Sequence, residues 1–349
     1  MNTLESSVGR SGVSSTVLLL IGCASLLILM IASLAIGRYP VPVAEVFRIA
    51  LATWPFGTGD PADKSWVTVE IVRLPRILAV TLSGSGLALC GAAMQGVLRN
   101  PLVGPDTTGV SAGANFGIVL GILLGMPLWN MACLGFAFGL CALPIAFAVS
   151  RPLGRGGVLA LVLSGFIVGA YFDSAIGLLQ YLADPLNKLP TITYWLLGSF
   201  AGVDYSKLTI LAAVTTVAGT ALLALRWRIN LLSLGDADAR TLGVNVTLLR
   251  WTMIGLVAAI VAAQACVSGG ITWVGLVVPH FARMLFGPEH SRLLPMSAVL
   301  GGGYLLLMDD IARSVGSDEI PIGLLTTFVG APFFAYLLRK QQNRGWSHV

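Results

Sequence analysis

The sequence contains little charge. Of its 349 residues, 11% are charged and 56% are hydrophobic, whereas about a quarter of the residues in a typical soluble domain are charged. A chain of this composition cannot bury its apolar side chains in one core surrounded by water. Its long uncharged runs also lack the alternation of polar and apolar residues that barrel strands show over about ten residues. The composition therefore predicts an all-α, polytopic membrane protein.

The sequence is also poor in residues that bind metals or nucleotides. It has three histidines, and its five cysteines fall inside apolar runs without metal-ligand spacing, where they act as small hydrophobic residues. No G-x-x-x-x-G-K-[ST] phosphate loop is present, so the sequence provides no cradle for a nucleotide. We expect no catalytic residues, no metal site, no disulfide and no cofactor bound by this chain, and no role in binding nucleic acid.

Uncharged runs divide the chain into ten segments that can cross a bilayer as helices. These predicted spans are residues 17–37, 77–98, 107–125, 127–150, 156–181, 208–225, 251–268, 271–287, 293–313 and 320–338. The first resembles a signal peptide, but its apolar run is too long and only Arg10 precedes it as a basic residue, which favours a retained helix. Residues 1–349 are thus expected to form one transmembrane domain.

Two stretches between the predicted spans are expected to stay outside the hydrocarbon. Residues 38–76 mix charges of both signs with Pro40, Pro42, Pro55 and Pro61. They end in Arg73-Leu-Pro-Arg76, where the second span is predicted to begin. Residues 184–206 are too broken by charge and proline to cross, so 192–200 is predicted to be an interfacial helix. The span at 77–98 is rich in small residues, which predicts a tightly packed inner helix.

The longest polar interruption lies near the middle of the chain, at residues 226–250. Leu231, Leu232, Leu234, Leu242 and Val244 flank Asp236, Asp238 and Arg240, and glycines stand at 235 and 243. Glycine at such positions ends one helix and permits the next to begin. The pattern suits two short amphipathic helices lying on a membrane or in a partner's groove, and a solvated loop is the simpler alternative.

The distribution of basic residues predicts the orientation. If the N-terminus is cytoplasmic, the inner segments hold most of the 21 basic residues, while the outer segments hold most of the acids. Both termini and residues 226–250 are then cytoplasmic. Arg73, Arg76 and Arg313 fall at span ends on the outer side, where topology does not favour positive charge.

Gln95 and Asp173 are polar residues inside predicted spans. Gln95 is explained either by a hydrogen bond between helices or by a place on a substrate path. Asp173 would be costly at membrane depth unless it is paired or hydrated. It could act in a proton relay, cap a neighbouring helix or line an aqueous vestibule.

The two halves of the chain are weakly similar to each other. Sliding the sequence by half its length superimposes Arg76 on Arg250, Gly96 on Gly270 and Pro105 on Pro279. The matches fall at helix starts and breaks. Because the matched spans run in opposite directions, we predict an inverted internal repeat, which transporters use for alternating access.

Motifs over residues 70–338 resemble those of the FecCD-type permeases, the membrane subunits of bacterial ABC importers for iron-siderophores, haem and vitamin B12. The matching stretches are Arg73-Leu-Pro-Arg76, Gly91-Ala-Ala-Met-Gln95, Asn100-Pro-Leu102, Gly109-Val-Ser-Ala-Gly113, Tyr194-Trp195, Gly202-Val-Asp204, Leu234-Gly235 with Ala239 and Leu242-Gly243, Gly275-Leu-Val-Val-Pro-His280 with Arg283, Asp310 with Arg313, and Glu319 with Pro321 and Gly323. Residues 1–69 show no distinctive match.

The resemblance implies a homodimer in the bacterial inner membrane, with two cytoplasmic ATPase subunits that use ATP and Mg and a periplasmic binding protein outside. The residues that it assigns to ATPase coupling are Leu234, Gly235, Ala239, Leu242 and Gly243. The arginines that it assigns to docking the binding protein are Arg73, Arg76 and Arg313. Met94, Gln95 and Asp173 are our candidates for the translocation path.

The expected function is import of an iron complex, either haem or a ferric siderophore, driven by a separate ATPase. Cobalamin is the alternative substrate. A different class of function is an ion-coupled carrier that uses Asp173 or Asp309-Asp310, and uptake driven by a proton gradient without ATP would reveal it. A non-transporting signalling or scaffold protein is disfavoured by the broken helices and by the absence of a sensor domain.

Overall fold

The computed structural model describes residues 15–53, 60, 62–150, 157–315 and 318–342, and within them every regular element is a helix. The longer helices are α1 Ser15–Ala35, α4 Leu74–Val97, α5 Val110–Leu123, α6 Leu128–Ser150, α7 Gly157–Leu182, α9 Tyr205–Ser233, α11 Val246–Ser268, α12 Val274–Phe286, α13 His290–Ser314 and α14 Ile322–Gln342. The shorter ones are α2 Val43–Thr53, α3 Lys64–Trp66, α8 Lys188–Leu196 and α10 Asp236–Thr241, with a π-helix at Val67–Arg73 and a 3-10 turn at Pro105–Thr108.

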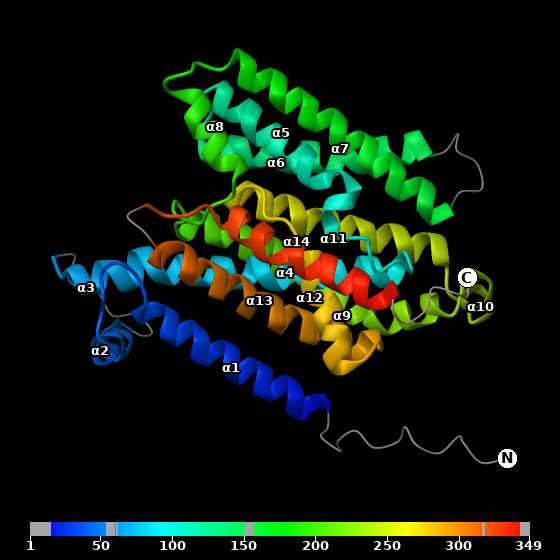
Figure 1. The fold of residues 1–349 in the computed structure, drawn as a ribbon, viewed down its shortest axis with the longest axis horizontal. Helices are drawn as coiled ribbons and strands as arrows, with labels where there is room; N and C mark the ends of the chain where they lie inside the picture. Colours follow the sequence, from blue (N-terminus) through cyan, green and yellow to red (C-terminus); the bar gives the residue numbers. More distant parts are fainter. Residues whose placement is uncertain (1–14, 54–59, 61, 151–156, 316–317, 343–349) are drawn as a thin grey trace.

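The longer helices lie roughly side by side, with α2 and α3 at one end of the bundle and α10 at the other (Figure 1). In the described residues, seven helices are long and apolar enough to cross a membrane, and α5, α12 and part of α14 are shorter apolar helices. Each predicted span overlaps one of the longer helices, and the assignment of ten membrane crossings stays a prediction. The all-α fold predicted from composition is confirmed.

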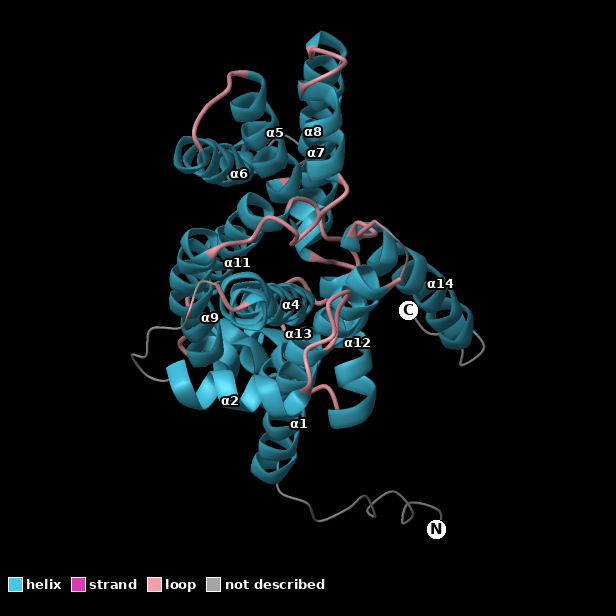
Figure 2. Ribbon diagram, turned by 90° about the vertical axis from the view of Figure 1, so that its left-hand side faces the viewer, coloured by secondary structure: helices cyan, strands magenta, loops and turns pink. Residues whose placement is uncertain are grey.

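Helix α4 lies at the centre of the bundle, between α9, α11, α12 and α13 (Figure 2). Glycines explain how closely its neighbours approach. A Cβ on Gly84 would lie 2.2 Å from the Gly301 carbonyl oxygen of α13, and one on Gly91 would lie 1.7 Å from the Gly275 carbonyl oxygen of α12. These backbones touch because neither position carries a side chain. The prediction of a tightly packed inner helix is confirmed.

The start of α4 differs from the prediction. Helical structure begins at Lys64, where the Asp63 carboxylate accepts a hydrogen bond from the Ser65 backbone N–H, and it continues without a break into α4. Pro75 lacks an N–H donor, and a π-helical turn precedes it, with the Leu74 N–H donating to the Val69 carbonyl. The proline is therefore absorbed within a long helix, and Arg73-Leu-Pro-Arg76 does not begin one.

The central interruption is also shorter than predicted. Helix α9 runs on to Ser233 and α11 already begins at Val246, which leaves α10 and its two flanking turns between them. Ile229 and Leu232 are fully buried, because they continue the apolar stripe of α9 past the basic residues Arg226 and Arg228. The sequence-based prediction ended this helix too early, because it took the charged residues on the other face of α9 as the helix end.

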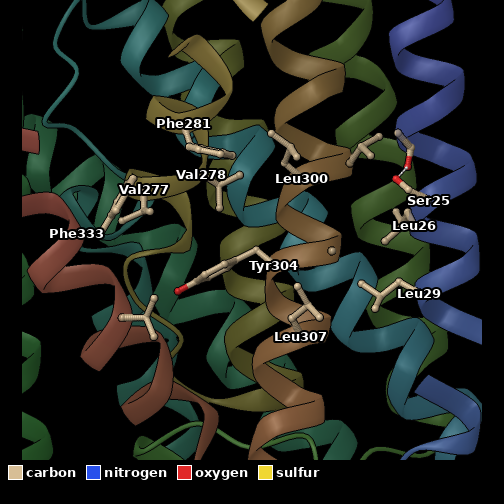
Figure 3. Close-up of a pocket in the computed structure, with 14 residues that line it drawn as sticks. Ser25, Leu26, Leu29, Val277, Val278, Phe281, Leu300, Tyr304, Leu307 and Phe333 are labelled. Carbon is tan, nitrogen blue, oxygen red and sulfur yellow. Dashed lines mark hydrogen bonds between the residues drawn. The ribbon is translucent and has the colours of Figure 1, made fainter. Parts of the chain in front are cut away.

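Helix α1 lies at the edge of the bundle and contacts it mainly through α13. An apolar groove of about 560 Å³ lies between α1, α12, α13 and α14 (Figure 3). Leu26 and Leu29 line it from α1, and Tyr304 and Leu307 line it from α13. Because α1 buries so little of its surface against the described residues, it contributes less to the core than the other long helices.

The short helices α5 and α12 begin in a similar way. Each begins directly after a residue with left-handed backbone, Gly109 with φ of 76° and Trp273 with φ of 72°. Helix α5 contacts α11, and α12 contacts α4. Gly109 and Trp273 are not matched in the register of the predicted internal repeat, which stays a prediction.

Candidate functional site

Helix α10 is anchored to both halves of the bundle through one carboxylate. Asp236 Oδ1 accepts hydrogen bonds from Arg99, which follows α4, and from Arg250 in α11, each at 3.1 Å. Gly235 and Gly243 flank the helix with positive φ angles of 124° and 80°, which a glycine adopts without strain. The two glycines thus form the turns that set α10 across the end of the bundle.

Large apolar side chains surround α10 on the surface. Leu234 and Leu242 are 59% and 57% exposed, and Trp227 and Leu248 are exposed as well. A groove of about 490 Å³ runs beside Trp227, Leu242 and Leu248. Exposed apolar groups gathered at one place on a rigid element are typical of a protein interface.

The structure separates the five predicted coupling residues into three kinds. Leu234 and Leu242 point away from the core and are free to contact a partner, whereas Ala239 is fully buried. Ala239 therefore fixes α10 to the bundle. Because it is buried, it cannot contact an ATPase directly in this arrangement. Gly235 and Gly243 act through the backbone turns.

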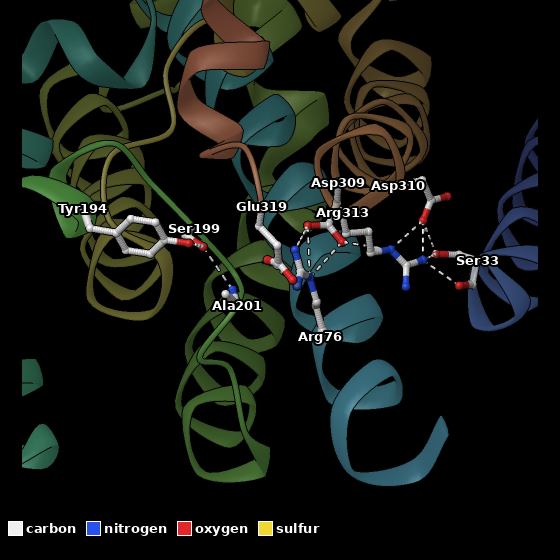
Figure 4. Close-up of polar contacts among 9 residues, drawn as sticks. All are labelled: Ser33, Arg76, Tyr194, Ser199, Ala201, Asp309, Asp310, Arg313 and Glu319. Carbon is white, nitrogen blue, oxygen red and sulfur yellow. Dashed lines mark hydrogen bonds and ion pairs between the residues drawn. The ribbon is translucent and has the colours of Figure 1, made fainter. Parts of the chain in front are cut away.

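An ion cluster occupies the opposite end of the bundle, where α4 begins and α13 ends (Figure 4). It consists of Arg76, Asp309, Asp310, Arg313 and Glu319. The Arg76 guanidinium donates from Nε and Nη2 to the Asp309 carboxylate at 2.9–3.2 Å and from Nη1 to both oxygens of Glu319 at 2.9 and 3.0 Å. All three of its nitrogens donate, and Nε and Nη2 together hold Asp309 in the bidentate geometry that arginine and carboxylates favour.

Arg313 ties the ion cluster to α1. Its guanidinium pairs with Asp310 and donates to the Ser33 hydroxyl at 2.6 Å, and that hydroxyl donates to Asp310 at 2.6 Å. Arg73 lies nearby and donates to the carbonyl of Leu34 at 2.6 Å.

The predicted docking arginines are therefore occupied within the chain. Arg73, Arg76 and Arg313 are all buried and bonded to groups of their own chain. Their docking role stays a prediction, and an outside carboxylate would have to replace an existing partner to reach them.

The predicted path residues lie in different surroundings. Met94 and Gln95 are buried in α4, and the Gln95 side-chain oxygen accepts from Arg283 of α12 at 2.8 Å. This bond realises the helix-to-helix role that was one of the two explanations for Gln95. Asp173 is exposed on α7, so of the three it is the one open to solvent or to a partner. The path assignment stays a prediction.

Sequence reasoning missed a second link near the α10 end. The side-chain oxygen of Asn230, in the last turns of α9, accepts from the backbone N–H of His290 at the start of α13 at 2.8 Å. The Asn230 amide donates to Ser291 at 3.1 Å. The sequence signal was the polar Asn230 inside an apolar helical stripe.

A junction of four glycines, Gly198, Gly269, Gly270 and Gly323, joins three chain breaks. A Cβ on Gly198 would lie 2.4 Å from the Gly270 oxygen, and one on Gly323 would lie 2.4 Å from the Leu197 oxygen. The end of α8, the α11–α12 connection and the start of α14 meet there through backbone atoms. The sequence showed the break at 269–270, but it did not show what packs against it.

In the described part of the chain, no group of histidine, cysteine and carboxylate side chains is arranged to hold a metal ion. The arrangement offers anchored apolar contacts at one end and a buried ion cluster at the other. The exposed apolar contacts are typical of a subunit that binds another protein.

The sequence model of the FecCD transport family matches residues 25–340, the whole bundle from within α1 to within α14. The chain belongs to the FecCD transport family. The resemblance drawn from its motifs is thus confirmed, and the FecCD-type fold accounts for every longer helix described above.

Named relatives of this FecCD chain are similar along most of their length. The molybdate import system permease protein of Haemophilus influenzae is 41% identical over 320 residues, which cover 92% of this chain and 94% of that protein. The hemin transport system permease protein of Yersinia pestis is 34% identical over 330 residues, 91% of this chain and 95% of that protein. This chain is accordingly a permease component of an ABC importer and a multi-pass protein of the inner membrane.

A solved structure shows the same fold. It is described as an inward-facing conformation of a metal-chelate type ABC transporter, and it is 40% identical to this chain with a TM-score of 0.83. The likeness covers 93% of this chain and 99% of the other. The arrangement of the FecCD helices is therefore shared at the level of the whole bundle.

Proposed function

We propose that this chain forms, as a homodimer with two ATPase subunits, the path by which a solute delivered by a binding protein enters the cytoplasm. In this proposal the α10 end faces the cytoplasm, in agreement with the excess of basic residues on that side. ATP and Mg are used by the ATPase subunits. The binding protein docks at the end that carries the ion cluster.

The observation that carries the proposal is the exposed, anchored surface at α10. Leu234 and Leu242 offer apolar contacts to an ATPase, while Asp236 connects α10 to Arg99 and Arg250. Arg99 stands before α5, and Arg250 stands in α11. A displacement of α10 by its partner therefore reaches both halves of the bundle.

Exposed aromatic side chains support the homodimer. Phe166, Tyr171 and Tyr181 on α7 and Phe328 on α14 are each more than two thirds exposed in the single chain. Such residues are enriched where subunits meet. A second copy packed on these faces would enclose the exposed Asp173 and make it available to a central path.

The proposed substrate is an iron complex, haem or a ferric siderophore. Similarity to the hemin permease of Y. pestis supports it. Molybdate is the second candidate, because the permease of H. influenzae named for it is 41% identical to this chain. Cobalamin remains the further alternative.

The test is uptake by the purified chain reconstituted in liposomes with its ATPase and binding protein. We expect ATP-dependent uptake of ⁵⁵Fe-labelled haem or ferric siderophore, with molybdate and cobalamin assayed side by side. Uptake of molybdate alone would correct the substrate and leave the importer role intact. Uptake driven by a proton gradient in the absence of ATP would overturn the importer role and favour an ion-coupled carrier.

A further inference from the structure

Glu319 differs from the other carboxylates of the ion cluster in its exposure. The side chains of Asp309 and Asp310 are 0% and 9% exposed, whereas that of Glu319 is 27% exposed. Asp309 and Asp310 also lie on α13 and each pairs with Arg313. Glu319 precedes α14 and is held in the cluster by Arg76. It is therefore the carboxylate that can leave with the least disturbance.

Exchange of Glu319 for another carboxylate would keep the charge of the cluster unchanged. Each of the three Arg76 nitrogens already donates to a carboxylate of this chain, so an incoming acid would compete with a present partner. Removing one partner of a buried pair without replacement is costly, whereas replacing it by an equivalent group is not. Arg76 also keeps Asp309 throughout.

Glu319 is close in sequence to the point where α14 enters the glycine junction. The Ile322 N–H donates to the Gly198 carbonyl at 2.9 Å, and Gly323 lies against the carbonyls of Leu197 and Gly270. The Ile320 N–H donates to the Ala312 carbonyl at 3.2 Å. The head of α14 is thus fixed by two backbone bonds, by glycine contacts and by the Arg76–Glu319 pair (Figure 4).

We propose that, in the chain without its partner, Glu319 occupies the position at Nη1 of Arg76 that a carboxylate of the docked protein partner takes in the complex. An acidic side chain of that partner displaces Glu319 from Nη1 of Arg76. Glu319 then releases the head of α14 at the glycine junction, where α8 and the α11–α12 connection also meet. Docking of the partner at the surface would in this way allow α14 to move, and we place α14 beside the path. The partner is the binding protein, so the inference rests on the proposed function.

The first experiment measures affinity of the binding protein for the transporter in lipid nanodiscs. Glu319→Gln removes the competing charge, and the binding protein should then bind about two- to fivefold more tightly, as the loss of a partly exposed ion pair allows. Glu319→Asp keeps a carboxylate and should remain close to the wild type. Glu45→Gln is the matched control, because Glu45 pairs with Arg48 on α2 at the same end and has no link to α14. Equal or weaker binding by Glu319→Gln would overturn the exchange.

The second experiment tests release of α14 without any partner. Spin labels at Val72 and Leu324, both exposed, report the distance between α14 and the π-helical turn before α4 in a chain whose exposed Cys23, Cys133 and Cys141 are replaced by serine. Glu319→Gln should broaden the distance distribution, and Glu45→Gln should not. An unchanged distribution would overturn the release. If the binding protein failed to bind the wild type, the proposed docking would fail while this measurement still decided whether Glu319 holds α14.

Discussion

At the scale of single residues, Asp309 shows how strongly the ion cluster depends on its balance. Its side chain has no exposed surface and faces both Arg76 and Arg313. An ion pair in such surroundings adds little net stability compared with apolar packing, but loss of one partner leaves a buried charge without compensation. The cluster is therefore tolerant of exchange and intolerant of deletion.

Replacement of Asp309 should destabilise the protein far more than replacement of an exposed partner. We expect Asp309→Asn to lower the free energy of unfolding by about 3 kcal/mol. Arg48→Ala, which removes the exposed pair with Glu45, should change it by less than about 1 kcal/mol. Thermal unfolding of both variants in detergent measures the difference, and equal melting temperatures would contradict the account of the cluster.

Glycine substitutions test the close helix contacts around α4. In Gly91→Ala the new methyl group would meet the Gly275 carbonyl, whereas Gly255 in α11 has open space around the same position. Overpacking a tight contact costs about 1–3 kcal/mol or more, while alanine favours a helix by up to about 1 kcal/mol over glycine. Gly91→Ala should therefore yield little folded protein on size-exclusion chromatography, and Gly255→Ala should match or exceed the wild type.

At the scale of elements, α10 has one anchored face and one exposed face. Ala239 and Asp236 fix it to the bundle, while Leu234 and Leu242 remain exposed. An element built this way can be altered on its exposed face without unfolding. Its proposed role in coupling is thus separable from its role in folding.

Leu242→Glu should abolish ATPase binding and ATP-driven uptake while leaving the melting temperature unchanged, because the side chain belongs to an interface. Leu186→Glu provides the control, since Leu186 is also highly exposed but lies between α7 and α8. Co-purification of the ATPase subunit reports binding. Normal coupling in Leu242→Glu would mean that the α10 turn is only a connector.

At the scale of the whole molecule, packing within the single chain leaves two apolar surfaces exposed. The aromatic faces of α7 and α14 are exposed, and the α10 end presents apolar groups. A permease that has no phosphate loop also requires a separate source of energy. Both observations lead to an assembly larger than one chain.

The purified chain should have twice its mass of 36.5 kDa in native mass spectrometry and should not hydrolyse ATP alone. Phe328→Glu places a charge on the exposed face of α14 and should shift the population to the monomer. Trp129→Glu makes a comparable change at an exposed site on α6 and should leave the dimer intact. A monomeric wild type, or ATP hydrolysis by the chain alone, would refute this assembly.

The sequence by itself determined the class of the protein, the places of its longer helices and its family. These features depend on local composition, because a bilayer requires about twenty apolar residues per helix wherever they occur. Boundaries set by a charge or a proline were wrong at Arg226 and at Pro75. There, the buried stripe of α9 and the π-helical turn before Pro75 carried the helices through.

Tertiary structure alone decided the partners of the arginines and the contacts of the glycines. Arg76 meets Asp309 and Glu319 across 233 and 243 residues of sequence, and Gly198, Gly270 and Gly323 meet from three separate chain breaks. No local pattern encodes such pairs, since they form only when the packing of α4, α13 and α14 brings distant segments together. The sequence placed the arginines at an end of the membrane region, and the packed bundle determined that they are buried there with carboxylates of their own chain.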